Sequence, residues 1–156
     1  MSSAIEAWKQ AEQQCFAYLL SITGATAQQN AFLGALPPET DAWMFQINGG
    51  PDPEYAHCTG AASFYAWMFT ADLLGQYPER EQALDLVGKI IEGMPAGCNH
   101  PRNSDSFETV QTFRLNAIPT VDLQYKELTN GGKDRRYGLW EVRASFDVVA
   151  NNIEQV

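Results

Sequence analysis

The sequence predicts an α+β domain: a mainly antiparallel sheet flanked by two helices, with a long β-hairpin at the C-terminal end. Two segments, residues 3–23 and 77–94, carry apolar side chains at the three- and four-residue spacing of amphipathic helices. The segments between and after them are extended, with alternating or continuous apolar residues. Because strands gather in runs and do not alternate regularly with helices, the α+β class is favoured over a parallel sheet. The 156 residues are the size of a single domain, 1–156.

The first helix is expected to begin at Ser3, which has capping-box spacing to Glu6, and to stop at Gly24. Such a helix would cover one face of a sheet. The expected apolar face contains Ile5, Trp8, Cys15, Leu19 and Ile22, and the expected outer side contains Lys9, Gln10, Gln13 and Gln14.

Two or three strands are expected before the second helix, depending on whether residues 30–38 contain one. The first is a short strand within residues 30–38, and the second is residues 42–47, which the glycines and prolines of 49–53 should end. Residues 61–73 are apolar on both sides and rich in aromatic residues, which favours a strand over a helix. We expect a central strand there, buried on both faces, or buried on one face and used in a subunit contact on the other.

The second helix has the clearest start and stop. Pro78 suits a first turn, and Glu79 and Glu81 favour the positive end of the helix dipole. Gly93 and Pro95 should end the helix. The expected buried stripe consists of Leu84, Val87, Ile91 and Met94.

The C-terminal part predicts a long hairpin. Residues 109–128 are extended, with an edge position or a bend at Pro119, and a glycine turn at 130–132 follows. The last strand has the strongest period-2 pattern of the chain. Its core side is expected to contain Trp140, Val142, Ala144, Phe146, Val148 and Ala150, and its other side Glu141, Arg143, Ser145 and Asp147.

Charge and composition exclude several classes of function. A net charge of −9 disfavours nucleic acid and anionic membranes as partners, and the chain has no apolar run of about 18 residues. The first residues lack the basic start and apolar core of a signal peptide, so we expect synthesis in the cytosol. The chain has an odd number of cysteines, and their spacing shows no pairs, which predicts reduced thiols at Cys15, Cys58 and Cys98.

Positive charge is concentrated in one segment of this acidic chain. Residues 126–143 hold five basic and three acidic side chains, a net charge of +2, so the remainder carries −11. One interpretation is a solvated hairpin tip that protects a sheet edge. The other is a docking arm for an acidic patch on a neighbouring copy or another protein, with Tyr137 and Trp140 as aromatic anchors. The predicted interface residues are Lys133, Asp134, Arg135, Arg136, Tyr137 and Arg143.

Candidate catalytic and metal-binding residues are few. His57, Cys58, Cys98 and His100 could form a tetrahedral zinc site, but adjacent ligands at 57 and 58 are poor geometry and the usual spacing is absent. Cys58 or Cys98 beside a histidine could be a nucleophile, yet no elbow or oxyanion glycine accompanies either. The 130–132 glycines lie between strands, so they do not form a phosphate loop. We therefore predict no catalytic residue, metal or cofactor.

The order of these segments resembles one family. The buried aromatic strand, the acidic-start helix, the strand "VDLQYKEL", the charged segment "TNGGKDRRY" and the final "GLWEVRASFDVVA" together resemble the tail terminator (tail-completion) proteins of long-tailed bacteriophages. The resemblance in detail covers about residues 62–150, and before them only the order of the elements agrees, beginning with a helix. The family's fold, a helix-flanked antiparallel sheet, is then expected here.

The resemblance implies a structural role without an enzymatic step. Such proteins form a ring, expected to be a hexamer, on the head-proximal end of the tail tube, in the virion and, during assembly, in the host cytoplasm. The implied partners are other copies of the chain, the major tail tube protein and the neck or head–tail connector protein. Two alternatives are another head–tail joining protein and a cytosolic ligand-binding or enzymatic α+β domain that uses the 57–58 and 98–100 loops.

Overall fold

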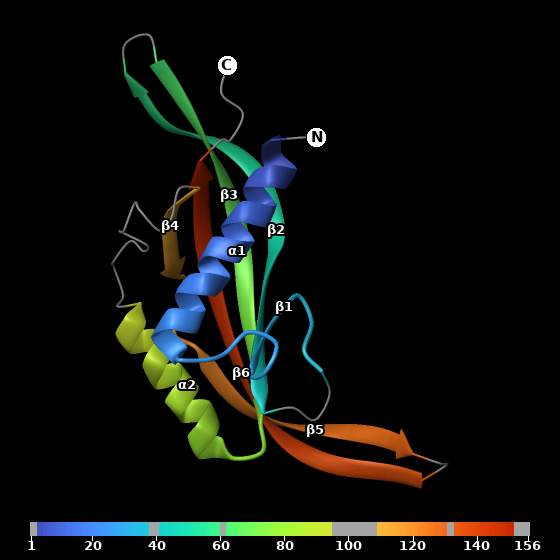
Figure 1. Cartoon of the computed structure of the whole chain (residues 1–156). Coiled ribbons are helices and arrows are strands. Elements are labelled where there is room, and N and C mark those ends of the chain that lie inside the picture. The colour runs from blue at the N-terminus through green and yellow to red at the C-terminus, as the bar shows by residue number, and fades with distance from the viewer. Residues whose placement is uncertain (1–2, 38–40, 60–61, 95–108, 131–132, 152–156) are drawn as a thin grey trace.

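The structure, a computed structural model, describes residues 3–37, 41–59, 62–94, 109–130 and 133–151, and it confirms the predicted α+β class. Two helices and six strands follow one another along these residues (Figure 1). They are α1 (Ser3–Thr23), β1 (Ala31–Leu33), β2 (Ala42–Thr59), β3 (Ala62–Tyr77), α2 (Arg80–Gly93), β4 (Val110–Leu115), β5 (Thr120–Asn130) and β6 (Lys133–Asn151). Within the described residues, neither helix is long and apolar enough to cross a membrane.

The strands form one mainly antiparallel sheet in the order β1-β2-β3-β6-β4. Among the described strands, only the short β1 runs parallel to its neighbour, β2. Both β4 and β5 pair with β6, β4 from Val110 to Leu115 and β5 from Thr120 to Asn130, so they occupy successive stretches of the same edge. The break between them contains Pro119, as the sequence predicted, because proline lacks the N–H that a continuous ladder needs.

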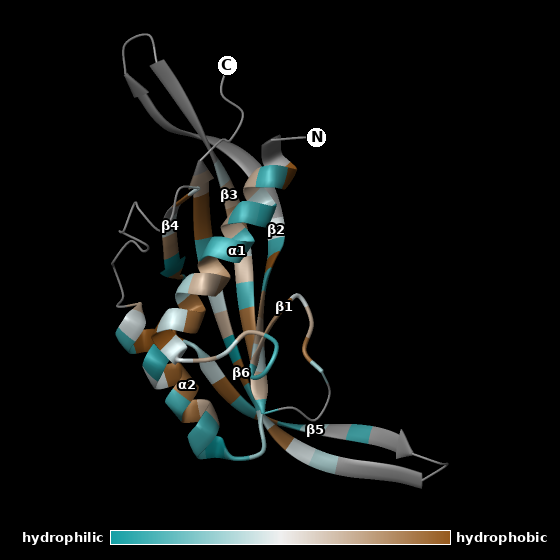
Figure 2. Ribbon diagram, viewed as in Figure 1, coloured by the Kyte–Doolittle hydropathy of each residue, from teal (hydrophilic) through white to brown (hydrophobic). Residues whose placement is uncertain are grey.

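The core lies between the sheet and the two helices, which cover the same face of the sheet (Figure 1). The rings of Phe45, Phe113 and Phe146 meet at its centre, with centroids 4.9–5.9 Å apart. The alternation of β6 is confirmed, since Val142, Ala144, Phe146, Val148 and Ala150 are buried and Trp140 is partly buried against them. Figure 2 shows hydrophobic and hydrophilic residues alternating along this strand.

Helix α1 buries a narrow stripe of small and medium side chains. Ala7, Ala11, Cys15 and Leu19 are fully buried at four-residue spacing, which lets the helix lie close to the sheet. Gly24 follows the helix with φ 71°, a left-handed conformation that glycine adopts without strain, so the predicted stop is confirmed. The predicted burial of Ile5 is wrong: the side chain lies at the first turn and is 43% exposed.

Of the glutamines predicted to point away from the sheet, Gln10 is exposed as predicted, whereas Gln14 is only partly exposed, and both accept hydrogen bonds from residues 109–110. The Gln14 Oε1 accepts hydrogen bonds from the backbone N–H groups of Thr109 and Val110 at 3.1 and 3.0 Å. The Gln10 Oε1 accepts one from the Thr109 hydroxyl at 2.6 Å. This flank of the helix therefore lies against the start of β4, where the amide side chains satisfy backbone donors that enter the core region.

Helix α2 begins at Arg80, with Glu79 at the N-cap position, so Pro78 precedes the helix and is not in its first turn. The Gln82 side chain accepts a hydrogen bond from the Glu79 N–H at 3.2 Å, which completes a capping box. The predicted buried stripe is wrong in part. The buried residues are Ala83, Leu86, Ile90 and Met94, whereas Leu84 and Ile91 are 40% and 43% exposed.

Strand β2 is longer than predicted. The glycines and prolines after Ile47 do not end it, because its pairing with β3 shifts register at three places and continues to Thr59. Such bulges accommodate residues that a regular ladder excludes. The β3 strand is central, as predicted, between β2 and β6. Among its described side chains, Phe69, Ala71 and Leu73 are buried on the helix-covered face, while on the other face Met68 is 37% exposed and Gln76, near the end of the strand, is buried.

Candidate protein-interaction site

The charged segment belongs to a β-ribbon that leaves the sheet. Pairing of β3 with β6 ends at Tyr77 and Trp140, whereas pairing of β5 with β6 continues to Asn130 and Lys133. Residues 124–130 and 133–139 therefore form a two-stranded ribbon beyond the other strands (Figure 1). The predicted charged loop is thus a strand from Lys133 onward. A two-stranded ribbon is marginally stable alone, so contacts with another chain would stabilise it.

The ladder register divides the basic residues between the two sides of this ribbon. Residue positions alternate in side along a strand, and Lys126 stands opposite Tyr137. Positions 126, 133 and 135 therefore share the side of Arg143, which continues the sheet face that no helix covers. Position 136 shares the other side with Glu127 opposite it. Of the predicted interface residues, Lys133, Asp134, Arg135 and Arg136 have side chains outside the described part, and Tyr137 is half-buried.

Arg143, another predicted interface residue, has a partner within its own chain. Its Nε donates to the Glu141 Oε1 at 2.6 Å. The sequence predicted a solvent-facing Glu141, but that residue is only 3% exposed. It lies where three strands run side by side, between Gln76 of β3 and Asp122 of β5. The Arg143 guanidinium therefore offsets part of the cost of burying the Glu141 charge, and it is also exposed at the surface.

Replacing Arg143 with alanine should lower the free energy of unfolding by about 1–2 kcal/mol, as loss of a hydrogen bond to a charged group does. Solvent exposure of the Arg143 guanidinium reduces this loss of stability, whereas burial of the Glu141 carboxylate increases it. Denaturant unfolding of the purified chain measures the change. Combining Arg143→Ala with Glu141→Gln should recover part of the loss, because the amide carries no charge. If the changes in the free energy of unfolding of the two single variants simply add in the double variant, the two residues are not coupled.

The other side of the ribbon base is apolar. A Cβ atom at Gly138 would lie 3.3 Å from Leu123 Cδ1 and 3.4 Å from Tyr125 Cε1, so these side chains lie over that glycine. Leu123 is 40% and Tyr125 59% exposed. Trp140, predicted as an anchor, is instead packed against the core, and the Arg80 guanidinium lies 5.8 Å from its ring centroid. The exposed apolar residues at the ribbon base are therefore Leu123 and Tyr125, and their exposure depends on a strand register that the sequence pattern does not specify.

A second ribbon lies at the opposite end of the sheet. Pairing of β3 with β6 stops at Ala66 and Asn151, while β2 and β3 remain paired up to Thr59 and Ala62 (Figure 1). The backbone thus projects at both ends of the sheet.

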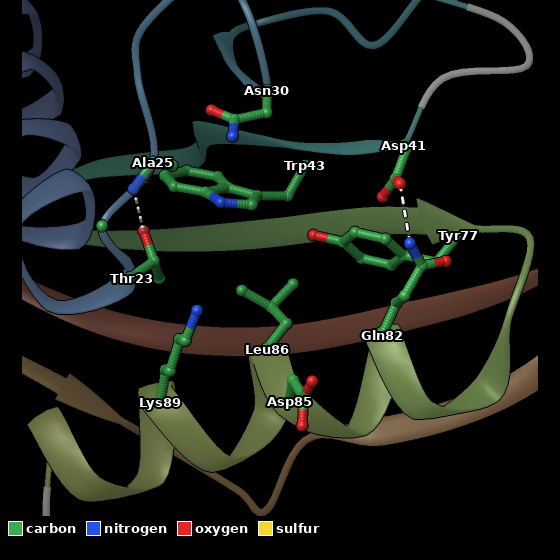
Figure 3. Close-up of a pocket in the computed structure, with 11 residues that line it drawn as sticks. Thr23, Ala25, Asn30, Asp41, Trp43, Tyr77, Gln82, Asp85, Leu86 and Lys89 are labelled. Carbon is green, nitrogen blue, oxygen red and sulfur yellow. Dashed lines mark hydrogen bonds between the residues drawn. The ribbon is translucent and has the colours of Figure 1, made fainter.

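A polar cleft of about 320 Å³ opens between the end of α1, helix α2 and strands β2 and β3 (Figure 3). Trp43 and Tyr77 lie on its strand side, and Gln82 Nε2 donates to Asp41 Oδ2 at 2.8 Å. Burial, and to a lesser degree the Asp41 charge, raises the pKa of Tyr77 well above its ordinary value, so the phenol stays neutral. Asp85 and Lys89 complete the helix side. The cleft holds hydrogen-bonding groups, and the described residues of its lining include no cysteine, serine or histidine that could form a nucleophile–base pair.

An apolar groove of about 660 Å³ lies beside β1. Phe16 of α1, Phe32 and Leu33 of β1, and Leu36 and Pro37 line it. The groove lies at the sheet edge that β1 forms. Further along β2, past its pairing with β1, the Ile47 N–H donates a hydrogen bond to Glu12 Oε2 at 2.8 Å. That contact satisfies an edge donor of β2.

The candidate zinc and nucleophile residues are not tested by the structure. The side chains of His57, Cys58, Cys98 and His100 lie outside the described part of the chain. Among the residues it does describe, no group of three or more histidine, cysteine or carboxylate side chains could hold a metal ion. Cys15 is a core residue, and burial, followed by the Glu12 charge, raises the pKa of its thiol well above the ordinary value. That thiol is therefore a poor nucleophile.

Comparison with known proteins gives distant structural likenesses. No family model and no curated protein matches the sequence. Among solved structures, a chain of the virion of a native gene transfer agent (GTA) particle aligns with a TM-score of 0.38 and 13% identity, over 92% of this chain and 93% of that chain. At this score and identity, the likeness assigns neither a family nor a function.

Proposed function

We propose that this chain is a non-enzymatic structural subunit of a phage-like virion. Copies of the chain form a ring, expected to be a hexamer, that caps the head-proximal end of the tail tube. The ring ends tube polymerisation and presents a surface to the neck or connector protein. Assembly takes place in the host cytoplasm, and the partners are further copies, the major tail tube protein and the neck protein.

The observation that carries this proposal is the β5–β6 ribbon. It projects beyond the sheet and brings the basic residues of the 126–143 segment away from an otherwise acidic body. Its base exposes Leu123 and Tyr125, which are the kind of side chains that anchor protein contacts. A closed ring requires two different complementary surfaces on each subunit. The sequence resemblance to tail terminator proteins covers about residues 62–150, which include the aromatic strand β3, helix α2 and the strands that build this ribbon.

Tail tubes assembled from the tube protein test the role directly. Adding the purified chain should give tubes of uniform length, each with a ring at one end, and electron microscopy measures both features. Tubes that grow without limit and carry no ring would contradict the proposal. Binding to connectors or filled heads, without binding to tubes, would favour the alternative of another head–tail joining protein.

A further inference from the structure

Two buried residues turn hydrogen-bond donors toward the polar cleft between the end of α1, helix α2 and strands β2 and β3. Trp43 is 2% and Tyr77 8% exposed, and both line this cleft. Figure 3 shows the indole nitrogen and the phenol oxygen directed toward its interior. Within the described part of the chain, neither group has a hydrogen-bond partner. Because buried polar groups are nearly always paired, the contents of the cleft must supply the acceptors for both donors.

A positive charge completes this set of donors. Lys89 of α2 lines the same cleft, and its ammonium group points toward Trp43 in Figure 3. Among the residues that the structure describes, no carboxylate forms an ion pair with Lys89, although Asp85 precedes it by one helical turn. Burial, followed by the Asp41 charge, raises the pKa of Tyr77, so its phenol keeps the proton that it can donate.

The chemistry of these donors selects an anionic oxygen as the bound acceptor. An indole N–H and an ammonium group donate only, so they do not recognise a cation. The Asp41 carboxylate on the strand side already accepts the Gln82 amide at 2.8 Å, and Asp85 is exposed. A carboxylate brings one negative charge, which the Lys89 ammonium can pair. A phosphate dianion would bring a second charge beside Asp41 and Asp85 and would be repelled.

We propose that this cleft binds a carboxylate group, held by the Trp43 N–H, the Tyr77 hydroxyl and the Lys89 ammonium. The volume of about 320 Å³ suits a short-chain acid, and the buried Leu86 supplies an apolar wall for its carbon chain. The carboxylate belongs either to a free small acid or to an acidic side chain of a neighbouring copy, since both present the same group. The site does not depend on the proposed ring.

Titration of the purified full chain with sodium acetate tests the site, with sodium chloride at equal sodium concentration as the reference. The chain has four tryptophans, whose indole N–H signals are separate reporters in nitrogen–proton NMR, and Trp43→Phe identifies the signal of Trp43. That signal should shift downfield and saturate with acetate, because a charged acceptor makes the stronger hydrogen bond. Acetamide has a similar shape without the charge, so it should bind about tenfold or more weakly.

Variants of the donors separate the site from general charge effects. Lys89→Gln should raise the Kd for acetate about tenfold or more, and Tyr77→Phe, which keeps the ring, should raise it about tenfold. The control Lys9→Gln removes an equal charge from an exposed position of α1 and should leave the Kd within about twofold. Circular dichroism and the dispersion of the NMR signals confirm that each variant is folded.

Sedimentation of the same samples separates the two sources of the carboxylate. If a neighbouring copy supplies it, both acetate and Lys89→Gln should weaken self-association of the chain. If a free acid supplies it, acetate should bind while self-association stays unchanged. A Trp43 signal that moves equally with chloride and acetate, or an equal Kd for acetate in Lys89→Gln and the unchanged chain, would overturn the site. Neither result would bear on tube capping, which is measured separately.

Discussion

Replacing Phe146 with alanine should lower the free energy of unfolding by about 3–5 kcal/mol, the usual cost of truncating a buried phenylalanine. The ring is fully buried, with centroids 4.9 Å from Phe113 and 5.9 Å from Phe45. Neighbours from two other strands border the resulting cavity, so the sheet is unable to collapse around it without moving its own ladder. Denaturant unfolding of the purified chain measures the loss.

The matched control is Asp147→Ala, one position along the same strand and on the uncovered face. Its carboxylate lies 3.7 Å from the Arg114 Nε in an exposed ion pair. Exposed pairs contribute little, so the loss should stay below about 1 kcal/mol. Equal losses at the two positions would mean that both faces of β6 are buried in the molecule that unfolds.

The sequence predicts β6 well because one physical constraint dominates it. A strand with one buried face must alternate, and Val142 to Ala150 do so without exception. Helix α2 was harder, because apolar residues occupy more than one side of it. Leu84 and Ile91 fit a buried stripe as well as Leu86 and Ile90 do, and only packing against the sheet decides between them. Leu84 and Ile91, predicted to be buried, are therefore exposed on the outer side of α2.

The candidate interaction site was predictable in charge but not in geometry. Lys133, Arg135 and Arg136 are visible as a cluster in the sequence, whereas their division between two sides depends on the pairing with β5. Local sequence does not specify that register. The exposure of Tyr125 depends on the same register, so the sequence pattern does not predict it either. The extent of β2 was missed for a related reason, since bulges allow glycine and proline inside a long strand.

Replacing Lys133, Arg135 and Arg136 together with serine should abolish tube capping while leaving the fold intact. These positions lie where β6 pairs only with β5, beyond the end of β3. Surface substitutions change stability by about 0.5 kcal/mol or less, so the Tm of the purified chain should move by no more than about 2 °C. Tails assembled with the variant should exceed their normal length or fail to join heads, which electron microscopy and head-joining assays detect.

Salt and a charge-matched variant separate a specific contact from a general loss of positive charge. Assembly of the unchanged chain should weaken as salt rises, because exposed charge pairs are screened within about 8 Å at physiological ionic strength. The control Lys9→Ser, Lys89→Ser and Arg114→Ser removes three other exposed basic residues and should retain capping. If the ribbon variant caps tubes of normal length and joins heads normally, the basic residues are a solvated hairpin tip. The ordering of the ribbon then depends on its apolar base at Leu123 and Tyr125, and not on charge.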